Sequence, residues 1–152
     1  MKKAILYISA IFTIVFTHAC QVSRGCDATE SLVKMGFYTD EPETAVSVEN
    51  VSVYGVGRED SLLYELQTIG TVLLPLSPAE ESSAFVFEYG NLKDTITFFY
   101  QTNTRFESQD CGFMADYRID NFDYTKNAID SIAQVTNEIT NENEEHYKIF
   151  FK

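Results

Sequence analysis

Three cysteines and two histidines are the residues of this chain whose chemistry depends most on spacing. Cys20 and Cys26 lie six residues apart near the N-terminus, whereas Cys111 lies far along the chain. A cysteine thiol can be acylated, joined in a disulfide, or activated as a nucleophile by a neighbouring histidine. Beyond Cys20 the only histidine is His146, so Cys111 with His146 is the one thiol and imidazole pair that could act together there.

The residues before Cys20 have the composition of a bacterial export signal. Two lysines follow Met1, and the segment Ala4–Thr17 is mostly apolar. Its fourteen residues fall within the ~7 to 15 of a signal core and below the ~20 of a membrane-spanning helix. Ala19 then places Cys20 where bacterial lipoproteins carry a diacylated thiol, although Thr17 replaces the usual leucine. We therefore predict a lipoprotein signal peptide over residues 1–19 and lipidation of Cys20.

Lipid on Cys20 would hold the protein on a membrane without a membrane-spanning segment. Each buried methylene contributes about 0.8 kcal/mol, and two acyl chains anchor stably where one is marginal. The first expected partner is therefore the membrane itself, reached through a short tether over residues 20–27.

Cys26 and Cys111 are the pair that we expect to form a disulfide. An exported chain enters an oxidising compartment, and with Cys20 acylated the two remaining cysteines suffice for one bridge. Closing so long a loop would stabilise the fold by roughly 4 to 5 kcal/mol in a chain-entropy estimate. It would also pin the first segment of the domain to the strand that begins at Gly112. The alternative is a nucleophilic Cys111 paired with His146.

The chain is strongly acidic, with 23 acidic and 11 basic residues and a net charge of −12. Loss of residues 1–19 would remove two lysines and no acid, which changes the net charge to −14. Such a field repels phosphate backbones and anionic headgroups, so we expect no nucleic-acid partner. The remaining 133 of 152 residues suit one domain, which we place at residues 28–152.

Alternation of apolar and polar residues predicts an all-β fold, and no segment has a helical period of similar quality. The clearest hairpin joins residues 84–89 to residues 95–106 across GNLKD. In CGFMADYRID one face is apolar and should point into the core: Phe113, Ala115, Tyr117 and Ile119. Strands with one apolar and one solvent-exposed face are typical of antiparallel sheets. We therefore predict a two-sheet sandwich, immunoglobulin-like in general architecture, with a small β-barrel as the alternative.

Further strands are expected at residues 31–39, 45–57, 127–139 and 146–151. Residues 127–139 also fit a helical stripe, but we favour a strand. Gly70 is interpreted as a hairpin turn between SLLYELQ and TVLLPL, and Pro75 places the end of the second run at a sheet edge or a strand exit.

The acidic residues of DYRIDNFDY could hold a hard cation, because calcium binds carboxylate oxygens. Asp116, Asp120 and Asp123 are the candidate ligands, but their spacing matches no standard calcium loop, and a solvated strand face explains them more simply. We expect no metal and no other cofactor. The sequence contains no GxSxG elbow, HExxH motif, P-loop or GxGxxG motif, so we expect a protein that is not an enzyme.

Several short segments resemble a family of small uncharacterised lipoproteins of Bacteroidota type, classed as a domain of unknown function: VLLPLSP, DTITFFYQ, FESQDCGF, NAIDSI and NENEEHYKIFF. The resemblance implies a location and an architecture, but no activity that could be transferred to particular residues. In lipoproteins of that type, acidic residues after the lipidated cysteine often accompany export to the cell surface, and QVSRG contains none. We therefore expect a lipid anchor in the outer membrane of the bacterial cell envelope, with the domain facing the periplasm.

Three functions of different class are compatible with these residues. The first is a binding or assembly module for an envelope protein, which should present an exposed aromatic or edge-strand patch. The second is a small-ligand or calcium-binding β module, which needs a cavity or converging aspartates. The third is a hydrolase with two carboxylates in a cleft. We expect the first.

Overall fold

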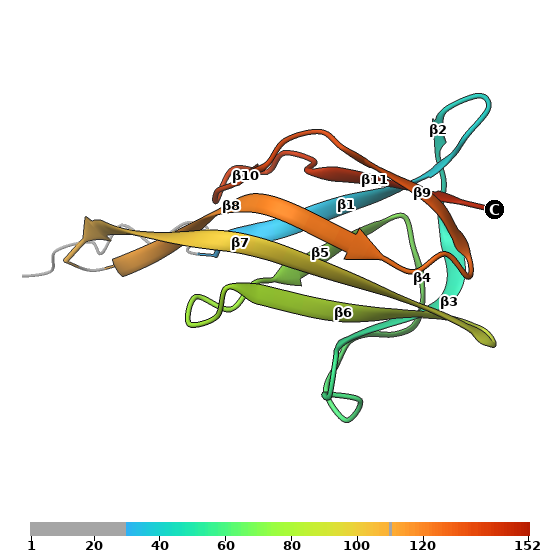
Figure 1. Cartoon of the computed structure of the whole chain (residues 1–152), viewed down its shortest axis with the longest axis horizontal. Helices are drawn as coiled ribbons and strands as arrows, with labels where there is room; N and C mark the ends of the chain where they lie inside the picture. The colour runs from blue at the N-terminus through green and yellow to red at the C-terminus, as the bar shows by residue number, and fades with distance from the viewer. Residues whose placement is uncertain (1–29, 110) are drawn as a thin grey trace, which may run out of the picture.

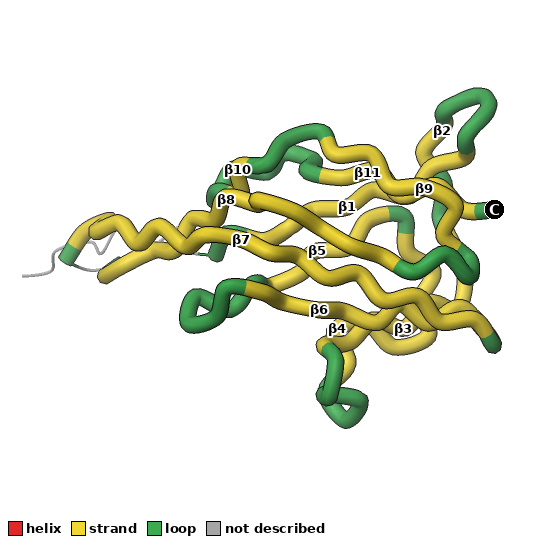
Figure 2. Tube along the Cα trace, in the orientation of Figure 1, coloured by secondary structure: helices red, strands yellow, loops and turns green. Residues whose placement is uncertain are grey.

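The computed structural model describes residues 30–109 and 111–152, and this part of the chain forms strands and no helix (Figures 1 and 2). The predicted signal peptide, the tether, Cys20 and Cys26 lie outside the described residues. The strands are β1 (Leu32–Thr39), β2 (Thr44–Ala45), β3 (Val48–Gly55), β4 (Leu62–Ile69), β5 (Thr71–Pro75), β6 (Ser82–Tyr89), β7 (Leu92–Ser108), β8 (Gly112–Tyr124), β9 (Ile129–Gln134), β10 (Glu138–Ile139) and β11 (Tyr147–Phe151).

Two sheets pack face to face, as predicted for a sandwich. Sheet A contains β1 paired with β11, then β9, while β5 and β2 pair with successive parts of the other side of β1. Sheet B has the order β10-β8-β7-β6-β3-β4. In the described residues both sheets are open at their edges, so the alternative of a closed β-barrel is wrong.

The core lies between the sheets and is built from alternate residues of each strand, because successive side chains of a strand point to opposite faces. Sheet A contributes Val33, Met35, Phe37, Val72, Leu74, Tyr147 and Ile149. Sheet B contributes Val51, Val53, Phe85, Phe87, Ile96, Phe98, Tyr117 and Ile119. The predicted hairpin is confirmed as β6 and β7. Residues 127–139 form strand and not helix, but the single predicted strand is divided into β9 in sheet A and β10 in sheet B.

Gly70 is not a hairpin turn. β4 belongs to sheet B and β5 to sheet A, so the chain crosses from one sheet to the other at this glycine. Its carbonyl accepts a hydrogen bond from Phe37 N at 3.0 Å, and a Cβ here would lie 3.0 Å from the Val46 carbonyl oxygen. A glycine is needed because two backbone segments approach each other closely at the crossing.

The prediction for CGFMADYRID is only half right. Tyr117 and Ile119 are buried, but Phe113 is highly exposed and Met114 is buried. The reason is that β7 and β8 extend together beyond the other strands, as a hairpin that projects from one end of the sandwich (Figure 1). Apolar and polar residues still alternate in this extension, but the hydrophobic core does not reach it. The alternation there no longer indicates which side chains are buried.

β11 pairs with β1 in parallel, from Met35 opposite Tyr147 to Tyr38 opposite Phe150. The other strand pairs of both sheets in the described residues are antiparallel. The predicted terminal strand is thus confirmed, and it lies in the middle of sheet A between β1 and β9.

Candidate interaction surface

The most unusual surface of the described structure is the outer edge of sheet B. β4 has one strand neighbour, β3, and nearly all its side chains are exposed. Three of them are leucines, Leu62, Leu63 and Leu66, and we call these three leucines the β4 edge surface. Apolar side chains gathered on an edge strand mark an interaction site or an aggregation hazard.

Leu66 is held in a conformation that leucine rarely adopts. It lies inside β4, where its backbone φ is 45°.

 A φ of 45° lies in the left-handed region, where a bulky side chain is an outlier that costs of the order of 1 to 3 kcal/mol. Glu65 and Leu66 together lie opposite Ser52 at a β-bulge, and the Leu66 N–H donates to Ser52 Oγ at 3.0 Å. The bulge turns Leu66 outward, and it is 69% exposed.

The two sheet edges are joined at this surface by Tyr64. Its hydroxyl accepts a hydrogen bond from the Leu73 N–H at 2.9 Å, so β4 satisfies a donor on the free edge of β5. The Tyr64 ring also packs against the core cluster. Tyr64 therefore ties β4, at the edge of sheet B, to the edge of sheet A.

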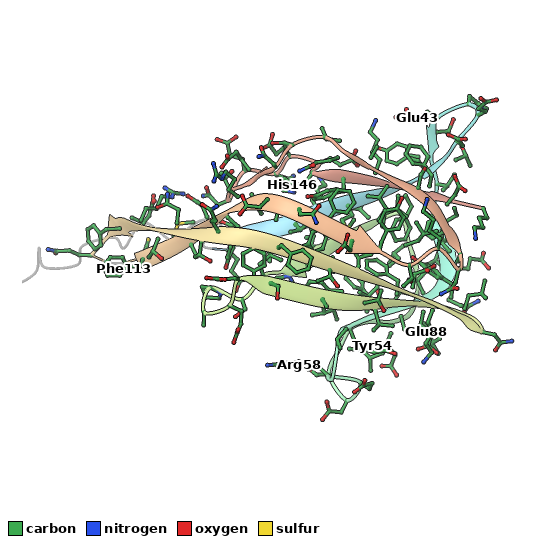
Figure 3. The ribbon with its side chains drawn as sticks, in the orientation of Figure 1. Glu43, Tyr54, Arg58, Glu88, Phe113 and His146 are labelled. Atoms are coloured by element: carbon green, nitrogen blue, oxygen red, sulfur yellow. The ribbon has the colours of Figure 1, made fainter. Side chains whose placement is uncertain are left out.

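A groove of about 360 Å³ adjoins the β4 edge surface. Its walls come from the β3–β4 connection and the β5–β6 connection, and its apolar lining includes Leu63, Val56, Leu76 and Phe85. Arg58 also lines the groove, and Figure 3 shows this residue on the loop that projects below sheet B. The volume is within the range of small-molecule sites, roughly 300 to 1,000 Å³.

The rim of the surface is acidic. Glu59, Asp60 and Glu65 are exposed beside the leucines, with Arg58 as the nearest basic residue in the sequence. An apolar centre with a charged rim is the usual anatomy of a protein interface. The sign of this rim favours a partner with basic residues around an apolar patch.

Asp94 accepts more hydrogen bonds than the other carboxylates of the described structure, and no pattern in the sequence marks it. It is 0% exposed, and its oxygens accept hydrogen bonds from the backbone N–H groups of Asn127, Ala128 and Ile129 and from the Thr125 hydroxyl, at 2.7 to 3.0 Å. Burial raises the pKa of Asp94, but the hydrogen bonds lower it by more. The pKa of Asp94 therefore lies below its ordinary value. The carboxylate ties β7 to the β8–β9 connection.

His146 is a second buried polar residue, 1% exposed. Its Nδ1 accepts a hydrogen bond from the Lys34 backbone N–H at 2.8 Å, and the His146 backbone N–H donates to the Lys34 carbonyl at 2.9 Å. Nε2 is buried without a hydrogen-bond partner among the described residues. Burial, and then the charge of Lys34, lowers the pKa of His146, so the imidazole is neutral.

The alternative pairing of Cys111 with His146 is not formed. His146 lies in the body of the sandwich, whereas Phe113 lies at the far end of the projecting hairpin (Figure 3). Cys111 is in the β7–β8 turn, two residues before Phe113, and its N–H donates to Ser108 Oγ at 3.0 Å. The predicted partner of Cys111, Cys26, lies outside the described residues.

The structure does not bring the three candidate calcium ligands together. Asp116 accepts hydrogen bonds from Arg105 Nε at 2.7 Å and from the Ser31 hydroxyl at 3.0 Å. Asp120 accepts one from Gln101 Nε2 at 2.8 Å, and Asp123 is an exposed residue further along β8. Within residues 30–109 and 111–152, no group of three or more acidic, histidine or cysteine side chains could hold a metal ion.

These observations define an all-β sandwich domain with an apolar, bulged edge. The chain belongs to a family of unknown function, DUF6452, whose model matches residues 50–151. The match begins in β3 and leaves out β1, although β1 contributes Val33, Met35 and Phe37 to the core. Neither a curated protein nor a solved structure matches the chain. No helix in the described residues is long and apolar enough to cross a membrane.

Proposed function

We propose that this protein is a lipid-anchored lipoprotein of the bacterial cell envelope and that its β4 edge surface binds a protein partner. The observation that carries the binding role is Leu66, an exposed leucine in a left-handed conformation on an edge strand. Strain of this kind persists where the surrounding structure imposes it, and it clusters at functional sites. No contact within the described domain requires a leucine at this exposed position.

Side chains, more than added backbone pairing, would carry the binding. The register of β3 with β4 shifts at three places, so β4 offers no long regular edge to a partner strand. Leu66 and Leu63 can instead enter a pocket of the partner, while Glu59 and Glu65 face its basic residues. The protein would then act as a non-enzymatic binding or assembly module.

The position of Cys111 supports a disulfide with Cys26. Ser31, at the start of the described chain, donates to Asp116 on β8. Cys26 is five residues before Ser31, a reach of at most about 17 Å. Cys111 is five residues before Asp116, a distance of about 17 Å along β8. The two cysteines can therefore meet beside the projecting hairpin, which would fix the chain between the lipid on Cys20 and the domain.

Site-specific photocrosslinking in the native envelope tests the binding role. A photoreactive phenylalanine analogue at Leu66 should crosslink to one envelope protein in a defined adduct. The matched control is the same analogue at Leu92, which is exposed in the β6–β7 hairpin, away from β4. If Leu66 gives no adduct, or if both positions give the same adducts, then the β4 edge surface is not a specific binding site.

The groove supports a second candidate, a small apolar ligand with an acidic group. Such a molecule would place its apolar part against Leu76 and Phe85 and its anion near Arg58. The fluorescent probe 1-anilinonaphthalene-8-sulfonate has both features. It should bind to the folded protein and bind less to Arg58→Ala, while the exposed variant Lys126→Ala serves as the control. Equal binding to all three proteins would exclude this use of the groove.

A further inference from the structure

The tip of the β7–β8 hairpin carries an exposed pair of aromatic rings. Phe106 and Phe113 lie opposite each other in the ladder, with ring centroids 5.5 Å apart in an edge-to-face arrangement. They are 59% and 73% exposed. Figure 3 shows Phe113 at the end of the hairpin, beyond the rest of the sandwich. Exposed apolar side chains that project from a domain indicate a contact with a partner or a membrane.

The basic residue next to this ring pair is already neutralised. Arg105 Nε lies 2.7 Å from Asp116 Oδ2, and Nη1 lies 2.7 Å from Glu107 Oε2. Its Nη2 donates to Asn141 Oδ1 at 3.1 Å. The contact that this tip makes must therefore depend on its apolar rings and not on attraction to anionic headgroups.

The position of the anchor indicates which apolar surface lies near. This step rests on the proposed function, in which Cys20 is lipidated and Cys26 is bonded to Cys111. Cys26 is the sixth residue after Cys20, so the two lie at most about 21 Å apart. Cys111 is two residues from Phe113, which adds about 7 Å along β8. The ring pair is thus held within reach of the bilayer surface that contains the lipid.

We propose that Phe106 and Phe113 form a second membrane contact, entering the headgroup region of the bilayer to which Cys20 is anchored. Apolar side chains on an otherwise polar element bind at this depth. The hairpin extends along the longest axis of the molecule (Figure 1), so the sandwich stands upright on the membrane. The β4 edge surface then faces sideways and remains accessible to a partner.

Tryptophan fluorescence tests this contact because the natural chain contains no tryptophan. The lipidated full-length variant Phe113→Trp is reconstituted into phosphatidylcholine vesicles that carry bromine at a shallow position of the acyl chains. The control is Leu92→Trp, an exposed site, 49% accessible, at the opposite end of β7. Phe113 lies opposite Phe106, fourteen residues along β7 from Leu92, so the two sites are roughly 46 Å apart along the hairpin. We expect at least twofold stronger quenching for F113W than for L92W, unchanged when a tenth of the lipid is anionic.

Intact mass and vesicle flotation of the same samples separate the two claims. If lipidated protein floats with the vesicles and F113W is quenched no more than L92W, the membrane contact of the tip is refuted while the anchor stands. If the protein carries no lipid and does not float, the proposed anchor fails and the tip contact fails with it.

Discussion

Asp94 and His146 each replace a piece of backbone pairing with a side chain. Asp94 accepts the N–H groups of the β8–β9 connection, and His146 accepts the Lys34 N–H at the start of the β1–β11 pairing. Both side chains are buried, and both satisfy backbone donors of neighbouring segments. The Asp94 oxygens and His146 Nδ1 are engaged by groups of the fold itself. They hold the two sheets in position, and we assign them structural roles.

Replacing Asp94 with alanine should destabilise the domain strongly. The change leaves the buried N–H of Ile129 and the half-buried N–H of Ala128 without their acceptor, so we expect a loss of about 3 to 5 kcal/mol in the free energy of unfolding. Urea denaturation followed by circular dichroism measures it. Asp123→Asn, an exposed carboxylate on β8, is the control and should change stability by no more than about 0.5 kcal/mol. Similar effects of the two variants would contradict the role of Asp94.

His146 should make the stability of the domain depend on pH. Its pKa in the folded protein lies below the ordinary value of 6.5, so the unfolded chain binds a proton that the folded chain does not. The full contribution is present above pH 6.5 and is lost as pH falls from there toward the folded pKa, by at most about 1.4 kcal/mol per pH unit.

Unfolding measurements at pH 7.5 and 5.5 on the wild type and on His146→Asn test this dependence. An asparagine oxygen can accept the Lys34 N–H but does not titrate. We expect the wild type to lose more stability than the variant over this interval. The reverse order, or parallel losses, would show that His146 is not kept neutral by the fold.

β4 is the element on which the binding proposal depends, and Leu66 is its testable feature. Asparagine tolerates the left-handed conformation much better than leucine. Leu66→Asn should therefore keep or raise the free energy of unfolding, by up to about 1 kcal/mol. Leu92→Asn, at a position without positive φ, should show no such gain. A loss of more than about 1 kcal/mol in Leu66→Asn would mean that this leucine stabilises the fold instead of serving a partner.

Strands could be predicted from the sequence where alternation coincides with burial, as for Phe85 and Phe87 in β6 and Ile96 and Phe98 in β7. The pairing of strands could not. A glycine between two apolar runs looks the same whether the strands pair or enter different sheets. The sequence therefore does not show that the chain crosses between the sheets at Gly70. The parallel pairing of β1 with β11 joins the two ends of the domain and leaves no local signal.

The candidate surface was predicted only as a kind of feature, an edge-strand patch. The residues that form it were hidden, because SLLYELQ reads as an ordinary strand and nothing in it indicates a bulge at Leu66. Asp94 precedes a strand in the sequence as many solvated aspartates do, and its acceptor role depends on residues more than thirty positions later. Phe113 was assigned to the core because alternation gives no sign of where a hairpin leaves the sandwich.

The whole molecule combines an open sandwich with one end that meets the chain leading to the predicted anchor. Sheet A is completed by β1, and β1 begins beside β8, where Ser31 reaches Asp116. The projecting hairpin, Cys111 and the start of the described chain therefore belong to the same end (Figure 1). The β4 edge surface lies on a different side of the molecule. This separation allows one end to be attached while an edge remains free to bind.

Intact mass of the protein purified from its native membrane, before and after reduction, tests the central claim most directly. The account predicts a chain that begins at Cys20, carries a diacylglycerol group, and gains the mass of two hydrogen atoms on reduction as the Cys26–Cys111 bond opens. An unlipidated chain whose mass does not change on reduction would contradict both the anchor and the disulfide.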